Sequence, residues 1–344
     1  RLCSLPIEIL HDIVFYLDTP SFVVLASTNQ LLMTLFYDDH VWLCRFQHDF
    51  HTLTTQDWKQ RHMALYRNHS ILSSRWMAGQ VTTHYLPDGH QDSVYCMTRF
   101  GQHHMISGSR DRCLKLWHLP TSKLIMTKRT PHDGSVLCLA VSPDSSTLIT
   151  GSSDATCILW SLPSMRRIGT LKGHRHGVLD VCYLPDGQTV VSSSRDHTLI
   201  IWHQGKELYR LLGHVGPVNS VKVYDADHVV SASGDCTLKI WNVRTGRCRQ
   251  QPINHGGFAC VQVDRERGLI YTGGHNGKLG IWHVDTGKCE ASLPGHHALI
   301  RSMHRFGSSW ILNILVTRSR ILSAGQDKQI MMLDFGHALQ PLDE

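Results

Sequence analysis

Residues 173–202 read GHRHGVLDVCYLPDGQTVVSSSRDHTLIIW, and this stretch decides the fold. It opens on a Gly-His pair and continues into a strand-like segment that begins at Val178. Ser192 then precedes Asp196 by four residues, and Trp202 follows that Asp by six. Short apolar segments separated by Gly and small polar residues predict several short β-strands rather than a long helix.

The same order of residues recurs six times along the chain. Each unit has a His near its start, a hydroxyl residue four positions before an Asp or Asn, and in five units a Trp six positions after it. The His residues are His90, His132, His174, His214, His255 and His296, and the pairs are Asp111/Trp117, Asp154/Trp160, Asp196/Trp202, Asp235/Trp241, Asn276/Trp282 and Asp327/Leu333. Successive Trp residues are 43, 42, 39 and 41 positions apart. This period and these recurring residues resemble WD40 repeats. The resemblance implies a mainly β protein in which each repeat supplies four strands of a β-propeller.

A recurring His, Ser or Thr, and Asp also suggests a hydrolase triad, but the repetition argues against one. A nucleophilic triad is needed once, beside an oxyanion hole. Here the trio returns in nearly every unit together with a Trp. We therefore expect a buried hydrogen-bond network in each blade, and no catalytic residues.

The last unit is irregular. His296 and Leu333 are 37 residues apart, where the other units take 27 or 28, and two strand-like openings, 300–306 and 311–316, follow each other. The expected propeller thus has six recognisable repeats, one of them truncated relative to a seven-bladed family. Because propellers of four to eight blades exist, six can close a ring, with residues 79–86 supplying the last outer strand.

The first fifty residues predict short helices. Pro6 suits a first helical turn, Thr19 is the expected N-cap of a second helix, and Ile9, Ile13 and Leu17 recur at intervals of four. Because fifty residues can enclose only a small core, part of this apolar surface is expected to contact another chain.

The pattern Leu-Pro-x-Glu-Ile-Leu at residues 5–10, with Thr19-Pro20 and Trp42 downstream, resembles an F-box. The resemblance implies docking on the adaptor Skp1 of an SCF-type (Skp1–cullin–F-box) ubiquitin ligase. The residues expected to contact Skp1 are Leu5, Pro6, Ile9, Leu10, Ile13, Leu17 and Trp42. The alternative is a helical cap that only covers the propeller.

Residues 56–73 are again helix-like, which predicts a stiff connection rather than a flexible tether. The expected domains are an F-box over 1–50, a helical linker over 51–76, a propeller over 77–337 and a tail over 338–344. The first residue is Arg rather than Met, which leaves room for a preceding segment.

Composition narrows the possible functions. No stretch approaches the roughly 18 apolar residues that span a bilayer, and eleven Cys without a CxxC pair predict free thiols in the cytoplasm or nucleus. The net charge is +6, and the sequence contains no runs of like charge. This distribution favours an acidic or phosphorylated partner over nucleic acid or a membrane. Phosphate-binding Gly loops and helix-borne metal spacings are absent from the sequence, so neither a cofactor nor a metal is expected.

WD40 propellers bind partners on the face where loops enter the inner strands. Two positions per repeat point there: one follows the first Val or Ile of the inner strand, and the other precedes the Asp. The residues expected to bind the target are Arg110, Arg195, Arg301, Tyr95, Asn219 and His275. In relatives that bind phosphorylated degradation signals, Arg at these positions holds the phosphate, for which its planar fork is suited.

These features predict a non-catalytic substrate receptor. Its front helices would bind Skp1, and through Skp1 a cullin–RING assembly, while the propeller face holds a protein to be ubiquitinated. The main alternative is a WD40 scaffold outside the ligase system, whose helices only cap the propeller.

Overall fold

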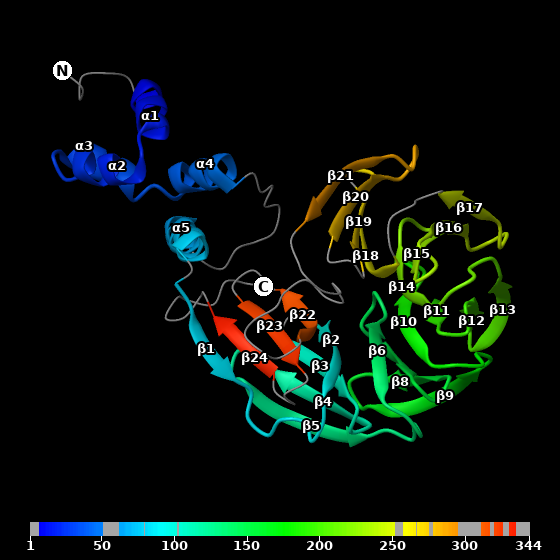
Figure 1. Ribbon diagram of the computed structural model, residues 1–344. Coiled ribbons are helices and arrows are strands. Elements are labelled where there is room, and N and C mark those ends of the chain that lie inside the picture. Colours follow the sequence, from blue (N-terminus) through cyan, green and yellow to red (C-terminus); the bar gives the residue numbers. More distant parts are fainter. Residues whose placement is uncertain are drawn as a thin grey trace. The chain divides into compact units, whose positions relative to one another are not determined.

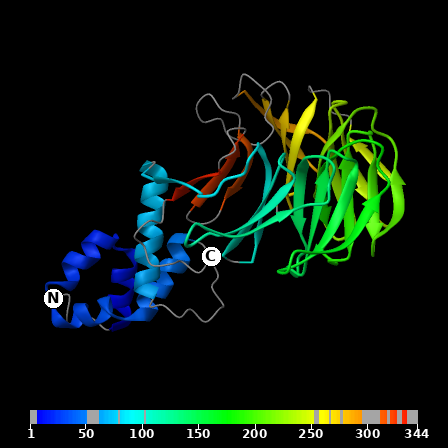
Figure 2. The same ribbon diagram turned by 90° about the horizontal axis from the view of Figure 1, so that it is seen from below.

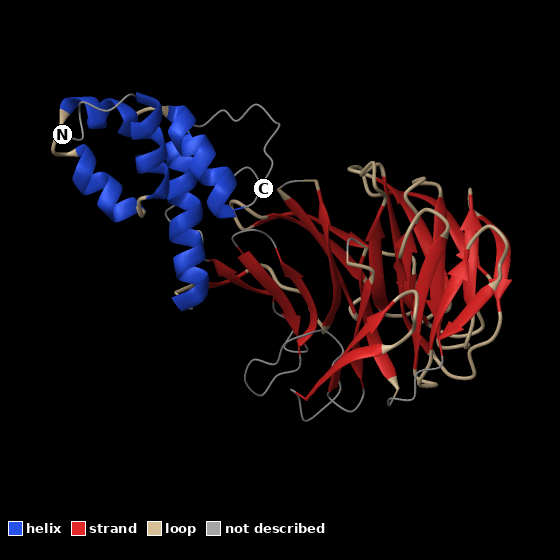
Figure 3. Cartoon of the chain, turned by 90° about the horizontal axis from the view of Figure 1, so that it is seen from above, coloured by secondary structure: helices blue, strands red, loops and turns tan. Residues whose placement is uncertain are grey.

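The computed structural model describes residues 7–50, 62–78, 80–101, 103–251, 257–265, 267–274, 278–294, 311–316, 320–325 and 330–334. The chain divides into two compact units, one of residues 1–82 with 334–344 and one of residues 83–333 (Figure 1). The described helices all belong to the first unit, and the described part of the second unit consists of strands, turns and loops (Figure 3).

Five helices form the described part of the first unit: α1 (Ile7–Tyr16), α2 (Thr19–Ala26), α3 (Gln30–Phe36), α4 (Asp39–Phe50) and α5 (His62–Ala78). The N-cap of α2 is Asp18 rather than the expected Thr19. The Asp18 carboxylate accepts a hydrogen bond from the Ser21 backbone N–H at 3.3 Å, and Pro20 lies in the first turn. Asp caps better than Thr because its charged oxygen also meets the positive end of the helix dipole.

A small aromatic core holds the helical unit together. The Trp42 ring lies 5.7 Å from Phe22 and 5.2 Å from Tyr66 between ring centroids, and its Nε1 donates to Phe36 O at 2.7 Å. Arg45 is buried beside these rings and donates to the carbonyls of Val14 and Leu17 at 2.9 and 2.8 Å. Val14 lies in the last turn of α1 and Leu17 directly follows the helix, a region where backbone carbonyls lack i+4 helical partners. Because Tyr66 belongs to α5, this helix completes the core of the unit.

The second unit contains six four-stranded sheets, which we number blades 1 to 6. The strands of each blade are given from inner to outer. Blades 1 to 3 are, in turn, β2 (Val94–Phe100), β3 (His104–Ser109), β4 (Cys113–His118) and β5 (Lys123–Arg129); β6 (Val136–Val141), β7 (Thr147–Ser152), β8 (Thr156–Ser161) and β9 (Arg166–Lys172); and β10 (Val178–Tyr183), β11 (Thr189–Ser194), β12 (Leu199–His203) and β13 (Lys206–Leu211). Blades 4 to 6 are, in turn, β14 (Val218–Val223), β15 (His228–Ser233), β16 (Leu238–Asn242) and β17 (Cys248–Gln251); β18 (Phe258–Asp264), β19 (Leu269–Gly274), β20 (Lys278–His283) and β21 (Cys289–Pro294); and β22 (Ile311–Val316), β23 (Arg320–Gly325), β24 (Ile330–Asp334) and β1 (Thr82–Tyr85). Successive blades stand side by side (Figures 1 and 2).

Blade 6 combines both ends of the repeat region. Strand β1 is its outer strand, which confirms the prediction that residues 79–86 supply it. Its inner strand is β22, the second of the two strand-like openings in the sequence. The first opening, 300–306, lies outside the described residues.

Five pairs of neighbouring blades, from 6 and 1 through to 4 and 5, pack through an apolar cluster that contains a Trp from one of the two sheets. The clusters include Trp117 and Ile330 between blades 6 and 1, Trp160 and Ile106 between 1 and 2, Trp202 and Ile149 between 2 and 3, Trp241 and Val191 between 3 and 4, and Trp282 and Val230 between 4 and 5. Full burial of one such side chain contributes roughly 1.5–3 kcal/mol.

The described sheets form an open arc. Their inner strands pack in the order β22, β2, β6, β10, β14 and β18, and no packing of similar extent among the described residues joins β18 to β22. The expected closed ring of six blades is therefore not what these sheets form. Because close packing at each interface sets the angle between neighbouring blades, six sheets do not automatically turn through a full circle.

Candidate binding face of the propeller

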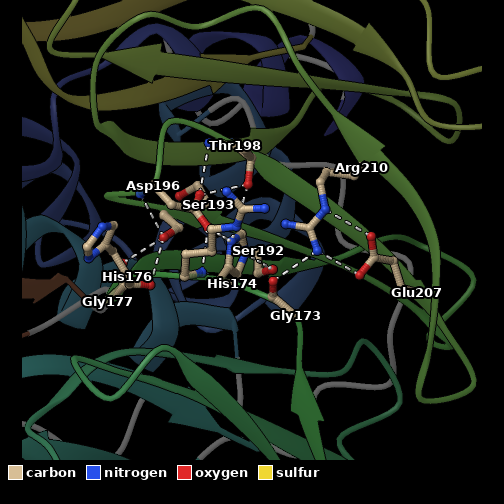
Figure 4. Close-up of polar contacts among 12 residues, drawn as sticks. Gly173, His174, His176, Gly177, Ser192, Ser193, Asp196, Thr198, Glu207 and Arg210 are labelled. Atoms are coloured by element: carbon tan, nitrogen blue, oxygen red, sulfur yellow. Dashed lines mark hydrogen bonds and ion pairs between the residues drawn. The ribbon is translucent and has the colours of Figure 1, made fainter.

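Four blades carry the predicted buried network in full. In blade 3, His174 Nδ1 lies 2.9 Å from Asp196 Oδ2 and His174 Nε2 lies 2.8 Å from Ser192 Oγ (Figure 4). Trp202 Nε1 donates to the same Ser192 Oγ at 2.8 Å. The equivalent contacts in blades 1, 2 and 4 join His90, His132 and His214 to Asp111, Asp154 and Asp235. In blade 5 the Trp282 Nε1 donates to Thr272 Oγ1 at 2.8 Å; His255 and Asn276 lie outside the described residues.

The environment of these carboxylates favours their charged form. Burial acts to raise the pKa of Asp111, but hydrogen bonds from His90 and from the Cys113 and Gln91 backbone N–H groups outweigh it and bring the pKa to about 2. The same balance holds the pKa of Asp235 at about 2 and the pKa values of Asp154 and Asp196 well below their usual range. Burial lowers the pKa of His214 despite the nearby Asp235.

This network fixes loops rather than performing chemistry. The Asp196 carboxylate also accepts a hydrogen bond from the backbone N–H of Arg175 at 2.8 Å. In blades 1, 2 and 4 the equivalent Asp accepts a hydrogen bond from the backbone N–H of the residue that follows the network His. Ser192 is fully buried and its Oγ accepts the Trp202 indole N–H, so a substrate cannot reach it. The repeated His, Ser and Asp therefore position the loops of the binding face.

A β-bulge interrupts the regular pairing at the start of each inner strand. The pairing shifts between Val94 and Cys96 in blade 1 and at the matching place in the other blades, which leaves Tyr95, Leu137, Leu179, Asn219, Ala259 and Leu312 at the bulge. Bulges commonly re-aim a side chain at a functional surface. In blade 6 this position belongs to Leu312, because β22 is the inner strand; Arg301 lies outside the described residues, as does His275.

The predicted binding residues have different surroundings. Asn219 is engaged within the propeller, since its side-chain amide donates to Phe258 O of the next blade at 2.6 Å. Arg110 is exposed, but its Nε lies 3.8 Å from the Asp92 carboxylate. Arg195 is exposed, and among the described residues no carboxylate lies within ion-pair distance of its guanidinium.

A cavity of about 870 Å³ opens beside Arg195. It is lined by basic residues of blade 3 and by apolar residues of three blades: Arg175, His176, Arg195 and His197 with Leu137, Leu179 and Pro217, together with Ser153, Gly177 and Asp196. The position-by-position prediction included Arg195 but missed Arg175, His176 and His197. The available signal was their adjacency to His174 and Asp196, the two fixed points of the repeat.

The loops of this cavity are held by hydrogen bonds. Arg195 N donates to Gly177 O at 3.0 Å, and Ser194 Oγ donates to His176 O at 2.8 Å. Gly177 permits the close approach of blade 2, because an added Cβ would lie 3.1 Å from Ser153 Cα. The basic side chains thus project from a backbone that is already ordered, which lowers the entropic cost of binding.

The residues expected to bind Skp1 divide into buried and exposed groups. Leu10 and Trp42 lie in the core of the helical unit, so they support its shape and are not themselves accessible. Ile9 is exposed on α1, Ile13 and Leu17 are half-buried, and Leu5 and Pro6 lie outside the described residues. Other exposed apolar side chains, which the sequence pattern did not single out, are Tyr16, Val23, Val24, Leu31, Met33 and Tyr37.

In the described part of the chain, no three or more His, Cys, Asp or Glu side chains gather in an arrangement suited to a metal ion. Likewise, none of the described helices is long and apolar enough to cross a membrane.

Residues 80–118, 123–161, 165–203 and 205–242 match the protein family described as WD domain, G-beta repeat. Each matched stretch covers the outer strand of one blade and the three inner strands of the next. This part of the chain consists of WD40 repeats. The solved WD40 β-propeller domain of Doa1 superposes on the chain with a TM-score of 0.62 at 18% identity, covering 73% of this chain and 97% of that one, a likeness that concerns the fold alone.

Relatives of the WD40 region have diverse names. Transducin beta-like protein 3 of Mus musculus is 37% identical over 30% of this chain and 15% of its own length. Autophagy-related protein 16 of Arabidopsis thaliana is 28% identical over 57% of this chain and 38% of its own length. Nuclear distribution protein nudF of Emericella nidulans is 35% identical over 50% of this chain and 40% of its own length. The chain therefore matches less than half the length of each of these relatives.

Proposed function

We propose that this protein is a substrate-recognition subunit of an SCF-type ubiquitin ligase. The observation that carries the proposal is that one chain combines two features of different chemistry. Exposed apolar side chains lie on a small helical unit, and a cavity lined by Arg and His lies on the propeller. Such a chain suits a receptor that connects a target to other machinery and does no chemistry of its own.

Seven apolar side chains of the helical unit are exposed, with exposed fractions from 37% to 83%: Ile9, Tyr16, Val23, Val24, Leu31, Met33 and Tyr37. These seven residues come from α1, α2, α3 and the residue that ends α3, and their exposure in a unit with its own aromatic core supports a protein partner. Because residues 5–10 resemble an F-box, Skp1 is the partner that we propose. Docking would bury these side chains and derive its affinity from a few of them.

The propeller face would hold the target. Arg175 and Arg195 suit an acidic or phosphorylated side chain, because a guanidinium can donate two parallel hydrogen bonds to carboxylate or phosphate. Leu137, Leu179 and Pro217 suit an adjacent apolar side chain. Ubiquitination would then be accelerated by proximity, since a lysine of the bound target is held near an E2 enzyme recruited through the cullin–RING assembly. These partners place the protein in the cytoplasm or nucleus.

Co-purification with Skp1 tests the proposal. We expect the full chain to retain purified Skp1 and a Val24→Asp/Leu31→Asp variant to lose it, because both side chains are exposed and a charge would be buried unpaired in the complex. Val215→Asp serves as the matched control, since Val215 is an exposed aliphatic residue of the propeller. If wild-type protein fails to bind Skp1, or if the double variant binds as well as wild type, the ligase proposal is wrong and a WD40 scaffold with capping helices becomes the better interpretation.

A further inference from the structure

The outer strands of three consecutive blades share a local irregularity. The pairing of β4 with β5 shifts between Leu116 and Trp117, which leaves Ile125 without a direct partner. The same shift leaves Ile168 unpaired on β9 and Leu208 unpaired on β13. Each of these blades therefore places an aliphatic residue at an equivalent bulge on its outermost strand.

These three side chains point outward from the propeller. In blade 1 the residues on either side of Ile125 contact different interblade clusters, Leu124 the cluster shared with blade 6 and Met126 the cluster shared with blade 2. Ile125, Ile168 and Leu208 are instead 49%, 58% and 53% exposed. The equivalent bulge of blade 5 holds Glu290, so the geometry of the bulge does not require an aliphatic residue.

The same strands are strongly basic. The residue two positions before each aliphatic bulge is Lys123, Arg166 or Lys206, and the twenty residues of β5, β9 and β13 contain eight Lys or Arg and one Glu. Among the described residues, Arg210 is the only one of the eight with a carboxylate partner, Glu207 at 2.9 Å. Lysine and bulges on an edge strand are general means of preventing sheet association, but that role does not call for exposed aliphatic side chains.

We propose that this rim, defined by Ile125, Ile168 and Leu208 with the basic residues of β5, β9 and β13, binds an anionic lipid surface. Clustered cations attract acidic headgroups, and short aliphatic side chains between them can enter the headgroup boundary. The bulges interrupt the free edge of each blade, so a contact through side chains is favoured over the addition of a strand from a peptide. A protein bound in this way lies on the membrane surface and needs no membrane-spanning helix.

The shape of the rim predicts which residue matters most. Strands β5, β9 and β13 lie along the curved outer edge of the blades (Figure 1). A flat bilayer meets a convex edge at its middle, so Ile168 of blade 2 should contribute more than Ile125 or Leu208. An acidic protein segment wrapped along the rim would instead contact all three blades about equally.

Vesicle co-sedimentation of the full chain tests the inference. We expect binding to phosphatidylcholine vesicles that contain about 30% phosphatidylserine, weakening at high salt, and much weaker binding to phosphatidylcholine alone. The triple variant Ile125→Ser/Ile168→Ser/Leu208→Ser should reduce binding at least about tenfold, with Ile168→Ser the most damaging single change. Val215→Ser, which removes an exposed aliphatic side chain from a loop between blades 3 and 4, should leave binding unchanged.

Three results would overturn the inference: equal binding to both vesicles, an unimpaired triple variant, or equal losses from the three single variants. Circular dichroism of each variant shows whether the fold is retained, and the bulge positions are exposed enough for Ser to be tolerated. The outcome is independent of Skp1 binding, since the rim belongs to the propeller and the proposed adaptor surface to the helical unit.

Discussion

Blades 1 and 3 carry Arg at the same position of the binding face but present different charge. In blade 1, Arg110 lies 3.8 Å from Asp92, two residues after the network histidine His90. In blade 3 the residue two positions after His174 is His176, so Arg195 has no such neighbour and shares the cavity with Arg175. The repeat fixes where a side chain is placed, and a single loop residue determines whether its charge is available to a ligand.

The largest expected effect comes from removing the anchor of the blade 3 loops. Asp196 is almost fully buried and joins His174, Thr198 and the backbone of Arg175. Asp196→Ala should therefore reduce the free energy of unfolding by about 3–5 kcal/mol, the usual cost of breaking a buried hydrogen-bonded pair. Urea denaturation followed by tryptophan fluorescence measures it.

The exposed Arg195→Ala variant is the control for Asp196→Ala. It should change the unfolding free energy by less than about 0.5 kcal/mol, because exposed side chains contribute little to stability. Equal destabilisation by both variants would contradict the division between a buried anchor and an exposed binding residue.

Acid should destabilise both blades by protonating their network carboxylates. The unfolded pKa of Asp is about 3.9, and that of Asp111 in the fold is about 2. Because the folded pKa is lowered, the stability that this carboxylate provides is complete above pH 4 and is lost as the pH falls through 2. The contribution is of the order of 2–3 kcal/mol. The pKa of Asp196 is held well below its usual range too, so blade 3 should resist acid at least as well.

Unfolding free energies measured between pH 5 and 2 check this expectation. The Asp111→Asn and Asp196→Asn variants should each be less stable at pH 5 and show a shallower loss on acidification than wild type. A wild-type curve without a decline in this range would mean that the network carboxylates have ordinary pKa values.

Much of the propeller could be predicted because its information is local and repeated. Residues such as Trp202 and Asp196 recur at fixed spacings, and their hydrogen bonds follow from the need to pair buried polar groups. The β1 strand of blade 6 was also predictable, since an incomplete last repeat needs a fourth strand. The open arc was not predictable, because it depends on the packing angle between sheets rather than on any repeat.

The binding site was only partly predictable for a similar reason. The rule for exposed positions identified Arg195, but it ranked Arg110 equally because the sequence does not show that Asp92 approaches it in space. Arg175 was missed because its exposure follows from a backbone hydrogen bond to Asp196, a contact across 21 residues. Burial of Trp42 likewise depends on Tyr66 of α5, and the role of this helix in the core has no local signature.

Exchanging the loop residue between blades 1 and 3 should transfer the difference in charge. In His176→Asp, a carboxylate enters blade 3 at the position that Asp92 has in blade 1, and we expect Arg195 to be neutralised. Affinity for phosphorylated peptides should then fall about tenfold, which corresponds to about 1.4 kcal/mol. The measurement is retention of a mixed pool of phosphopeptides on immobilised protein, compared with the same pool after phosphatase treatment.

The reciprocal change, Asp92→His, sharpens the comparison. It frees Arg110 but provides no counterpart of Arg175, because blade 1 has Gln91 at that position. We therefore expect at most a small gain in phosphopeptide retention, well below the loss caused by His176→Asp. A gain as large as that loss would show that one unpaired Arg suffices and that the pair in blade 3 has no special role. Unchanged retention in His176→Asp would instead mean that the blade 3 cavity is not where an acidic target binds.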